Sequence, residues 1–175
     1  MPLSPFSNNK NRTGVFSGQG ALSHLEEILP RYKNILIFND KDGFQPCGAA
    51  GFFKTLEEKL SGRCTFQYVS YTGKALPIED VEAKYLEVKL HHGVDLIAAV
   101  GGGTVIDLAK IIAIAYSHRC ESAADVLSSP NLTNHVDLLF IPTTAGTGSE
   151  ATSFAVVYKD KVKYSIDRPG LLPAY

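Results

Sequence analysis

The sequence of 175 residues has no tryptophan, one methionine and only three cysteines. These cysteines, Cys47, Cys64 and Cys120, are odd in number and far apart, which argues against a disulfide framework and a clustered zinc site. A reducing, cytoplasmic setting is therefore expected. The N-terminus has no apolar core of signal-peptide length, and no apolar run is long enough to cross a bilayer. The sequence thus predicts neither a secreted nor a membrane-embedded protein.

An excess of charge of one sign is also missing. Lysine and arginine number 17 and aspartate and glutamate 18, for a formal net charge of −1. This balance gives no electrostatic case for binding nucleic acid or an acidic membrane surface. With 45% hydrophobic and 20% charged residues, the composition suits a well-packed core. The length allows one domain, or one piece of a longer protein.

Short β-branched runs alternate with longer helical stretches, which is the pattern of βαβ units and a parallel sheet. Strands are expected near Gly14–Ser17, Asn34–Phe38, Cys64–Ser70, Leu96–Val100 and Leu138–Ile141. Helices are expected near Ala21–Leu29, Ala49–Leu60, Ile78–His92 and Val105–Tyr116. The last of these helices is apolar on nearly every side, so it should be covered on both sides.

Two short alternating runs near the C-terminus, Ser153–Tyr158 and Val162–Ile166, predict a β-hairpin. The stretch Asp167–Tyr175 is rich in turn-forming residues and is expected to be an irregular extended tail. The predicted fold class is therefore α/β, with a Rossmann-like, mostly parallel sheet flanked by helices and a short β-hairpin near the C-terminus.

The strongest local signal is the triple glycine at 101–103, which joins the buried run Leu96–Val100 directly to a helix. Glycines let backbone N–H groups approach a ligand closely, and a helix N-terminus favours phosphate. The pattern predicts a pyrophosphate site. The alternative is a tight strand-to-helix turn with a capping box between Thr104 and Asp107, and the two interpretations are compatible.

A second motif, PTTAGTGSE at 142–150, follows the next expected strand. Its threonines, serine and glycines supply hydroxyl groups and flexible backbone at the carboxyl edge of that strand, where open α/β sheets bind ligands. Alone, such a segment is usually only a loop. Its position at the same end of the same sheet as the triple glycine favours contact with a ligand.

The third candidate is Asp40, at the end of the expected strand Asn34–Phe38. A carboxylate at a strand tip can accept both ribose hydroxyls of an adenosine and repels a 2′-phosphate, which favours NAD over NADP. Asp40 can equally cap the turn that follows it. The neighbouring Asn39 could also take the ribose role.

The pairing of GGGTVIDLAK at 101–110 with PTTAGTGSEAT at 142–152 resembles the iron-containing alcohol dehydrogenase family, also called group III alcohol dehydrogenases. The likeness extends from FSGQGALSHL at 16–25 to KYSIDRPGLLP at 163–173. It implies a two-domain enzyme with an N-terminal nucleotide-binding α/β domain, of the dehydroquinate synthase type, and a C-terminal helical domain. Residues 1–175 are expected to be the dinucleotide-binding domain, without the helical metal-binding domain.

The resemblance also implies roles for residues around the triple glycine. Gly102, Gly103 and Thr104 match positions that hold the pyrophosphate of a nicotinamide cofactor, and Asp107 is counted with them as cofactor-binding. Asp40 matches the acid that binds the adenosine ribose. The implied cofactor is NAD, with NADP as the alternative.

Further cofactor contacts are implied in the second motif and the hairpin. Thr143, Thr144 and Thr147 match the loop over the phosphates and the nicotinamide side, and Lys163 matches a lysine that reaches the cofactor ribose. Leu76 stands where an asparagine is frequent, which puts one adenosine-side contact in doubt.

In this family, an aspartate and three histidines on the helical domain bind the catalytic iron or zinc. The five histidines of this chain are scattered and lack ligand spacing, so neither a metal site nor a catalytic residue is predicted in it. Iron or zinc is expected only with the missing domain. The resemblance implies an NAD(P)-dependent dehydrogenase that transfers a hydride between the cofactor and a small alcohol or aldehyde. Assembly into a homo-oligomer is left as an open alternative.

Two alternatives stay open at this point. One is another enzyme of the same architecture, such as a glycerol dehydrogenase, a glycerol-1-phosphate dehydrogenase or a dehydroquinate-synthase-like cyclase; the PTTAGTGSE loop argues against it. The other is a truncated chain that binds a nucleotide or another subunit and turns nothing over, which the missing half supports. The chain alone is expected to be inactive.

Overall fold

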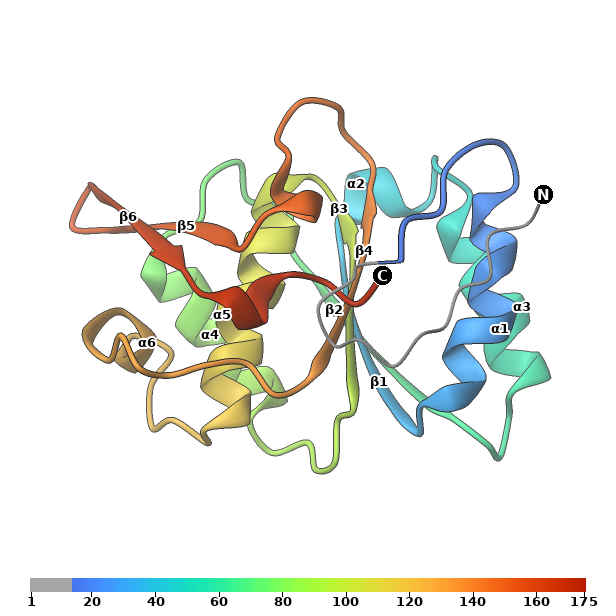
Figure 1. The fold of residues 1–175 in the computed structure, drawn as a ribbon, viewed down its shortest axis with the longest axis horizontal. Coiled ribbons are helices and arrows are strands. Elements are labelled where there is room, and N and C mark those ends of the chain that lie inside the picture. Colours follow the sequence, from blue (N-terminus) through green and yellow to red (C-terminus); the bar gives the residue numbers. More distant parts are fainter. Residues whose placement is uncertain (1–13) are drawn as a thin grey trace.

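A computed structural model describes residues 14–175, so the expectation that the N-terminus is not a signal peptide lies outside the described residues. The fold is α/β, with a four-stranded parallel sheet and a separate antiparallel hairpin (Figure 1). The strands are β1 (Asn34–Asn39), β2 (Thr65–Ser70), β3 (Leu96–Gly101), β4 (Asp137–Pro142), β5 (Phe154–Lys159) and β6 (Val162–Asp167). This confirms the predicted fold class.

The α-helices are α1 (Leu25–Ile28), α2 (Lys41–Phe44), α3 (Ala49–Lys59), α4 (Ile78–Val88), α5 (Gly103–Ser117) and α6 (Asp125–Ser128). Short 3-10 turns are η1 (Ala21–His24), η2 (Leu29–Arg31), η3 (Ser149–Ala151) and η4 (Pro169–Leu171). The sequence did not predict α2 and α6, which are only four residues long.

The parallel sheet has the strand order β2-β1-β3-β4. After β1 the chain passes to α3 on one face, and after β3 it passes to α5 on the other face (Figure 1). Connections that diverge from two adjacent strands open a crevice at their carboxyl ends, and ligands of open α/β folds bind there. In this chain the crevice lies where Asn39 pairs with Val100.

Side chains of β1 alternate between two apolar layers. Ile35 and Ile37 pack with the α1 and α3 side, whereas Leu36 and Phe38 pack with the α4 and α5 side. All four are at most 1% exposed. A strand buried on both faces reads as a continuous apolar run, which is why the sequence located β1 well.

The central helix α5 is buried from Val105 to Ala115. One side packs on β3 and the other is covered by β5, α4 and α6. The expectation of cover on both sides is confirmed. The hairpin thus lies against the helix that begins at the triple glycine.

Several expectations about individual elements were wrong. Residues 14–17 form no strand; the backbone N–H of Gly14 donates to the carbonyl of Ala174 at 2.8 Å. The helix expected over Ile78–His92 ends at Val88; beyond it Leu90 is 79% exposed and Gly93 adopts φ +70°. The helix expected to begin at Val105 begins two residues earlier, at Gly103.

The C-terminal tail is more ordered than the sequence predicted. After η4, Phe140 of β4 donates its N–H to the carbonyl of Tyr175 at 3.0 Å, and Ala174 donates to the carbonyl of Leu138 at 2.8 Å. The tail therefore covers the edge of β4, where unpaired backbone groups would otherwise remain. Within the described part of the chain, no helix is long and apolar enough to span a membrane.

Candidate functional site

The triple glycine carries the chain from β3 into α5. Gly102 is the N-cap of α5, with φ −77° and ψ 179°, and no side chain caps the helix. The predicted capping box between Thr104 and Asp107 is therefore absent. The N-cap is Gly102, two residues before Thr104, so the carboxylate of Asp107 lies too far into the helix to bind the N-cap N–H. The first N–H groups of α5 are left for a ligand, as helix N-termini generally require.

Close packing explains the glycines at 102 and 103. Neither has a positive φ, so backbone conformation does not require glycine there. A Cβ on Gly102 would lie 3.1 Å from Oγ1 of Thr144, and one on Gly103 would lie 3.0 Å from Cβ of Thr147 and 3.1 Å from Oγ of Ser149. The β4–η3 loop therefore lies directly against the glycine turn, and both predicted motifs meet.

Asp107 faces the site from the second turn of α5 and is 8% exposed. Its Oδ2 accepts the backbone N–H of Val156 in β5 at 3.0 Å, whereas Oδ1 is buried without a hydrogen-bond partner. Burial raises the pKa of this carboxyl, whereas the Val156 N–H, the ammonium of Lys110, the neighbouring hydroxyl of Ser149 and the ammonium of Lys163 act in the opposite direction. A buried acceptor without a donor is costly, so a bound group that donates to Oδ1 would stabilise this site.

A pocket of about 230 Å³ opens in front of Asp107. It is lined by Lys74, Ala75, Leu76, Gly103, Thr104, Asp107, Thr147, Ser149, Val156 and Tyr158. Four of the residues predicted from the sequence thus share one hollow at the start of α5. The segment at 74–76 was missed as a pocket wall, although Leu76 had been compared with the family; its place is fixed by the bond from the Tyr158 N–H to the Leu76 carbonyl, 2.8 Å.

Asp40 lies on the other side of the glycine turn, and its N–H donates to the carbonyl of Val100 at 3.0 Å. Its Oδ1 accepts the N–H of Asp42 at 2.9 Å and so caps α2. Of the two carboxylate oxygens of Asp40, only Oδ1 has a hydrogen-bond partner among the described residues. Asn39 is 4% exposed, and its Oδ1 accepts the hydroxyl of Ser70 at 2.9 Å. The side-chain amide oxygen of Asn39 is thus engaged within the sheet, which leaves Asp40 as the better candidate for binding the ribose.

Thr143 links Asp40 to the second motif. Its N–H donates to the carbonyl of Gly101 at 3.0 Å, and its Oγ1 is buried with no hydrogen-bond partner. The same Oγ1 would lie 3.1 Å from a Cβ at Gly43, in the turn that Asp40 caps. The predicted residues Asp40 and Thr143 are therefore neighbours across the carboxyl ends of the sheet.

Lys163 is less closely placed than the other predicted residues. It is exposed on β6 and pairs with Tyr158, which lines the pocket. Directly paired residues of a hairpin point to the same face, so Lys163 lies on the side of Tyr158, and its charge lowers the pKa of the Asp107 carboxyl. The structure brings Lys163 near the site without making it part of the pocket wall.

Lys110 was not singled out from the sequence, yet its side chain binds the segment 149–154, which begins at the pocket wall. The side chain is 0% exposed, and its ammonium donates to the carbonyls of Ser149 (2.6 Å), Thr152 (2.7 Å) and Phe154 (2.7 Å). One signal could have found it. A lysine three residues after Asp107, inside a helix that is otherwise apolar, needs a buried partner.

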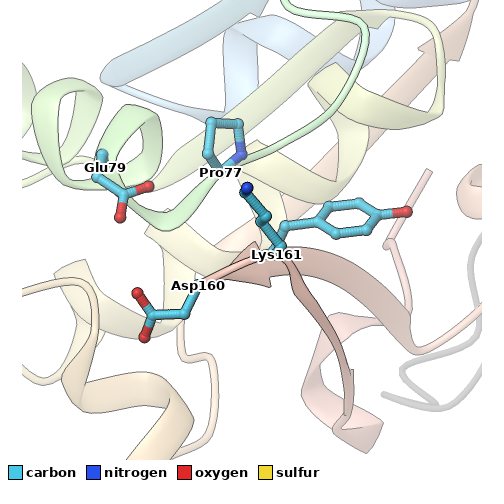
Figure 2. Close-up of a pocket in the computed structure, with 5 residues that line it drawn as sticks. Pro77, Glu79, Asp160 and Lys161 are labelled. Atoms are coloured by element: carbon cyan, nitrogen blue, oxygen red, sulfur yellow. The ribbon is translucent and has the colours of Figure 1, made fainter.

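A larger hollow of about 510 Å³ lies at the tip of the hairpin, lined by Pro77, Glu79, Tyr158, Asp160 and Lys161 (Figure 2). None of the predicted residues lines it. Figure 2 shows charged groups of both signs around an open space, with the amino group of Lys161 beside Pro77. Without a buried unpaired atom, this hollow is a weaker ligand site than the smaller pocket.

Comparisons with known proteins identify the family. Residues 12–175 match the model of the family described as iron-containing alcohol dehydrogenase. An alcohol dehydrogenase of Thermococcus barophilus is 27% identical over 172 residues, which cover 94% of this chain and 44% of that protein.

Solved structures share the fold. An iron-containing alcohol dehydrogenase from Thermotoga maritima has a TM-score of 0.81 at 22% identity, covering 93% of this chain and 45% of that one. Sulfoacetaldehyde reductase from Bifidobacterium kashiwanohense, in complex with NAD+, has a TM-score of 0.75 at 22% identity, covering 97% and 45%. The chain thus spans less than half the length of these three relatives.

Proposed function

Because this chain belongs to the iron-containing alcohol dehydrogenase family, we propose that residues 1–175 form the dinucleotide-binding domain of an NAD(P)-dependent alcohol dehydrogenase. One observation carries the proposal. At the crevice between β1 and β3, the uncapped start of α5 meets two buried oxygen atoms without partners, Oδ1 of Asp107 and Oγ1 of Thr143.

The residues fit a dinucleotide in chemical terms. The free N–H groups at Gly103 and Thr104 suit a diphosphate, which is favoured by the positive end of the helix dipole. Oδ1 of Asp107 suits an N–H or O–H donor on the nicotinamide side, since a buried carboxyl oxygen otherwise goes unsatisfied. A nicotinamide dinucleotide, when bound, accepts or gives the hydride.

The adenosine end is assigned to the turn after β1. Asp40 keeps one carboxylate oxygen for the turn and has a second to accept a ribose hydroxyl. Its negative charge supports NAD rather than NADP, because a 2′-phosphate would meet a like charge. Thr143, Thr144 and Thr147 are proposed to lie over the phosphates, and Lys163 to reach the ribose on the nicotinamide side.

The metal implied by the family does not fit the described residues. No group of three or more histidine, cysteine, aspartate or glutamate side chains in residues 14–175 could hold a metal ion. Residues 14–175 therefore supply no ligand set for iron or zinc. What these residues contribute to alcohol or aldehyde chemistry is the position and electrostatic environment of the cofactor.

The proposal is tested with the 175-residue chain itself. NADH fluorescence should report saturable binding that ADP-ribose competes away, because most proposed contacts are to the diphosphate and ribose groups. Simple alcohols with NAD+ and added Fe²⁺ or Zn²⁺ should give little or no turnover. Absence of NADH binding would contradict the cofactor role. Robust metal-dependent turnover would contradict the proposal that these residues bind the cofactor but do not catalyse the reaction on their own.

A further inference from the structure

The ammonium of Lys110 is the best-enclosed charge in the described part of the chain. The side chain is 0% exposed and its three N–H bonds are matched by three carbonyl acceptors at 2.6–2.7 Å. The nitrogen also lies 5.5 Å from the centre of the Phe140 ring. Burying a charge is costly unless its hydrogen bonds are satisfied, and here they are.

The three acceptors all belong to one short segment, residues 149–154. It runs from η3 into β5 and makes few local bonds, among them Ala151 N–H to the Gly148 carbonyl at 3.0 Å. Carbonyls separated by two or three residues converge on one point only when the backbone folds in a single way. Lys110 therefore selects the conformation of this segment from the side of α5.

Both ends of the segment touch the proposed cofactor site. At its start, Ser149 lies with Thr147 against Gly103 and lines the pocket. Just after its end, the N–H of Val156 binds Oδ2 of Asp107 at 3.0 Å. Asp107 and Lys110 are one helical turn apart, so a single stretch of α5 anchors the pocket wall at two points.

We infer that Lys110 is a positioning residue of the cofactor site: its ammonium binds the carbonyls of residues 149–154 and so holds Thr147 and Ser149 against the glycine turn. This inference rests on the proposed function, since it assigns a consequence for dinucleotide affinity. A merely structural lysine would stabilise the fold and leave the affinity of the folded protein unchanged.

The protonation state of Lys110 supplies a readout in the unmodified chain. Burial lowers its pKa to about 8, and the carboxylates of Asp107 and Glu150, which face it from α5 and η3, act in the opposite direction. A neutral amine donates two hydrogen bonds and cannot satisfy three carbonyls. NADH affinity should therefore fall as the pH rises through 8. Lys110→Arg keeps its charge throughout, so its affinity should not fall over that range.

The first experiment compares two lysines that bind carbonyls. Lys89 donates to the Glu121 carbonyl at 2.6 Å, lies 5.6 Å from the centre of the Tyr85 ring and does not line the pocket. NADH titration at pH 7 should show that Lys110→Met loses about tenfold in affinity, the effect of one or more lost charge-assisted hydrogen bonds, while Lys89→Met stays near the wild-type value. Equal affinity in a folded Lys110→Met variant would overturn the inference and leave the proposed function standing.

The second experiment needs no cofactor, so it separates the two proposals. Amide hydrogen exchange in Lys110→Gln, compared with Lys89→Gln at the same pH, should be faster across residues 143–156 and unchanged in β1 and β3. Unchanged exchange in that segment would overturn the positioning role. If the wild-type chain fails to bind NADH, the proposed function fails, and the effect on affinity fails with it.

Discussion

Two loops border the glycine turn, and they are held by different kinds of contact. The turn after β1 is closed locally, because Oδ1 of Asp40 binds the N–H of Asp42 and the Asp40 carbonyl accepts the N–H of Phe44. The loop after β4 is closed from a distance, by the ammonium of Lys110 and the carbonyl of Gly101. The first should keep its shape when its neighbours change, and the second should not.

The same difference separates direct from indirect effects on the cofactor. Asp40 offers a charge from a turn that local hydrogen bonds close. The threonines of the β4–η3 loop offer hydroxyl groups whose positions depend on α5. Substitutions at the glycine turn should therefore act through the second loop, whereas a substitution at Asp40 that keeps the capping oxygen should act through charge alone.

The largest effect is expected from Gly103→Val, which disrupts the packing of the β4–η3 loop against the glycine turn. The new side chain would overlap Thr147 and Ser149 and displace them, so NADH affinity should fall at least about a hundredfold at a cost of about 1–3 kcal/mol in folding free energy. NADH titration and chemical denaturation measure both quantities.

The matched control is Gly51→Val, in α3, where a Cβ would meet nothing within 4 Å. It should leave both NADH affinity and stability close to wild type. Near-normal NADH affinity in folded Gly103→Val would mean that the loop and the glycine turn do not act together on the ligand.

The next effect sharpens the role of the local turn. Asp40→Asn keeps an oxygen to accept the Asp42 N–H but removes the charge, so the turn should persist. The ratio of NADPH to NADH affinity should rise about tenfold, mainly through tighter NADPH binding, since a like-charge contact with a 2′-phosphate is lost. Parallel titrations of both cofactors, with the exposed Asp42→Asn as control, measure this ratio. An unchanged ratio would confine Asp40 to capping α2.

The smallest effect concerns the pH dependence of stability at Asp107. Burial raises its pKa, so the folded chain holds this proton more tightly than the unfolded chain does. Its protonation therefore favours the fold at low pH, and that contribution is lost as the pH rises from the ordinary aspartate value through the raised one. Asp107→Asn should remove this part of the pH dependence.

Denaturant unfolding between pH 3.5 and 7 tests the point, because all other carboxyl groups titrate in both proteins. The difference between the two stability curves then belongs to Asp107. Parallel curves for wild type and Asp107→Asn would show that the carboxyl is not desolvated, and would weaken its assignment as a buried acceptor.

Local chemistry explains what the sequence could predict. Continuous apolar runs marked β1, β3 and β4, and three glycines after a strand marked the start of a helix within two residues. Asp40 was offered both as a ribose ligand and as a cap, and the structure shows the cap directly. These features depend on residues close together in the chain.

Features that depend on distant contacts were missed. The three carbonyls that accept hydrogen bonds from Lys110 lie about forty residues away in sequence, so no local sequence pattern predicts them. The capping box failed because the helix begins at Gly103, which puts Asp107 in reach of Val156 rather than of the cap. The tail at Ala174 pairs with β4 because an edge strand was available, which periodicity cannot reveal.

One measurement tests the central claim most directly: a two-dimensional NMR titration of the labelled chain with NAD+. Shifts should concentrate at residues 40–43, 101–107 and 143–149, which border the crevice between β1 and β3. Shifts confined to the hairpin tip around Asp160, or no saturable shifts at all, would contradict a cofactor site at the glycine turn.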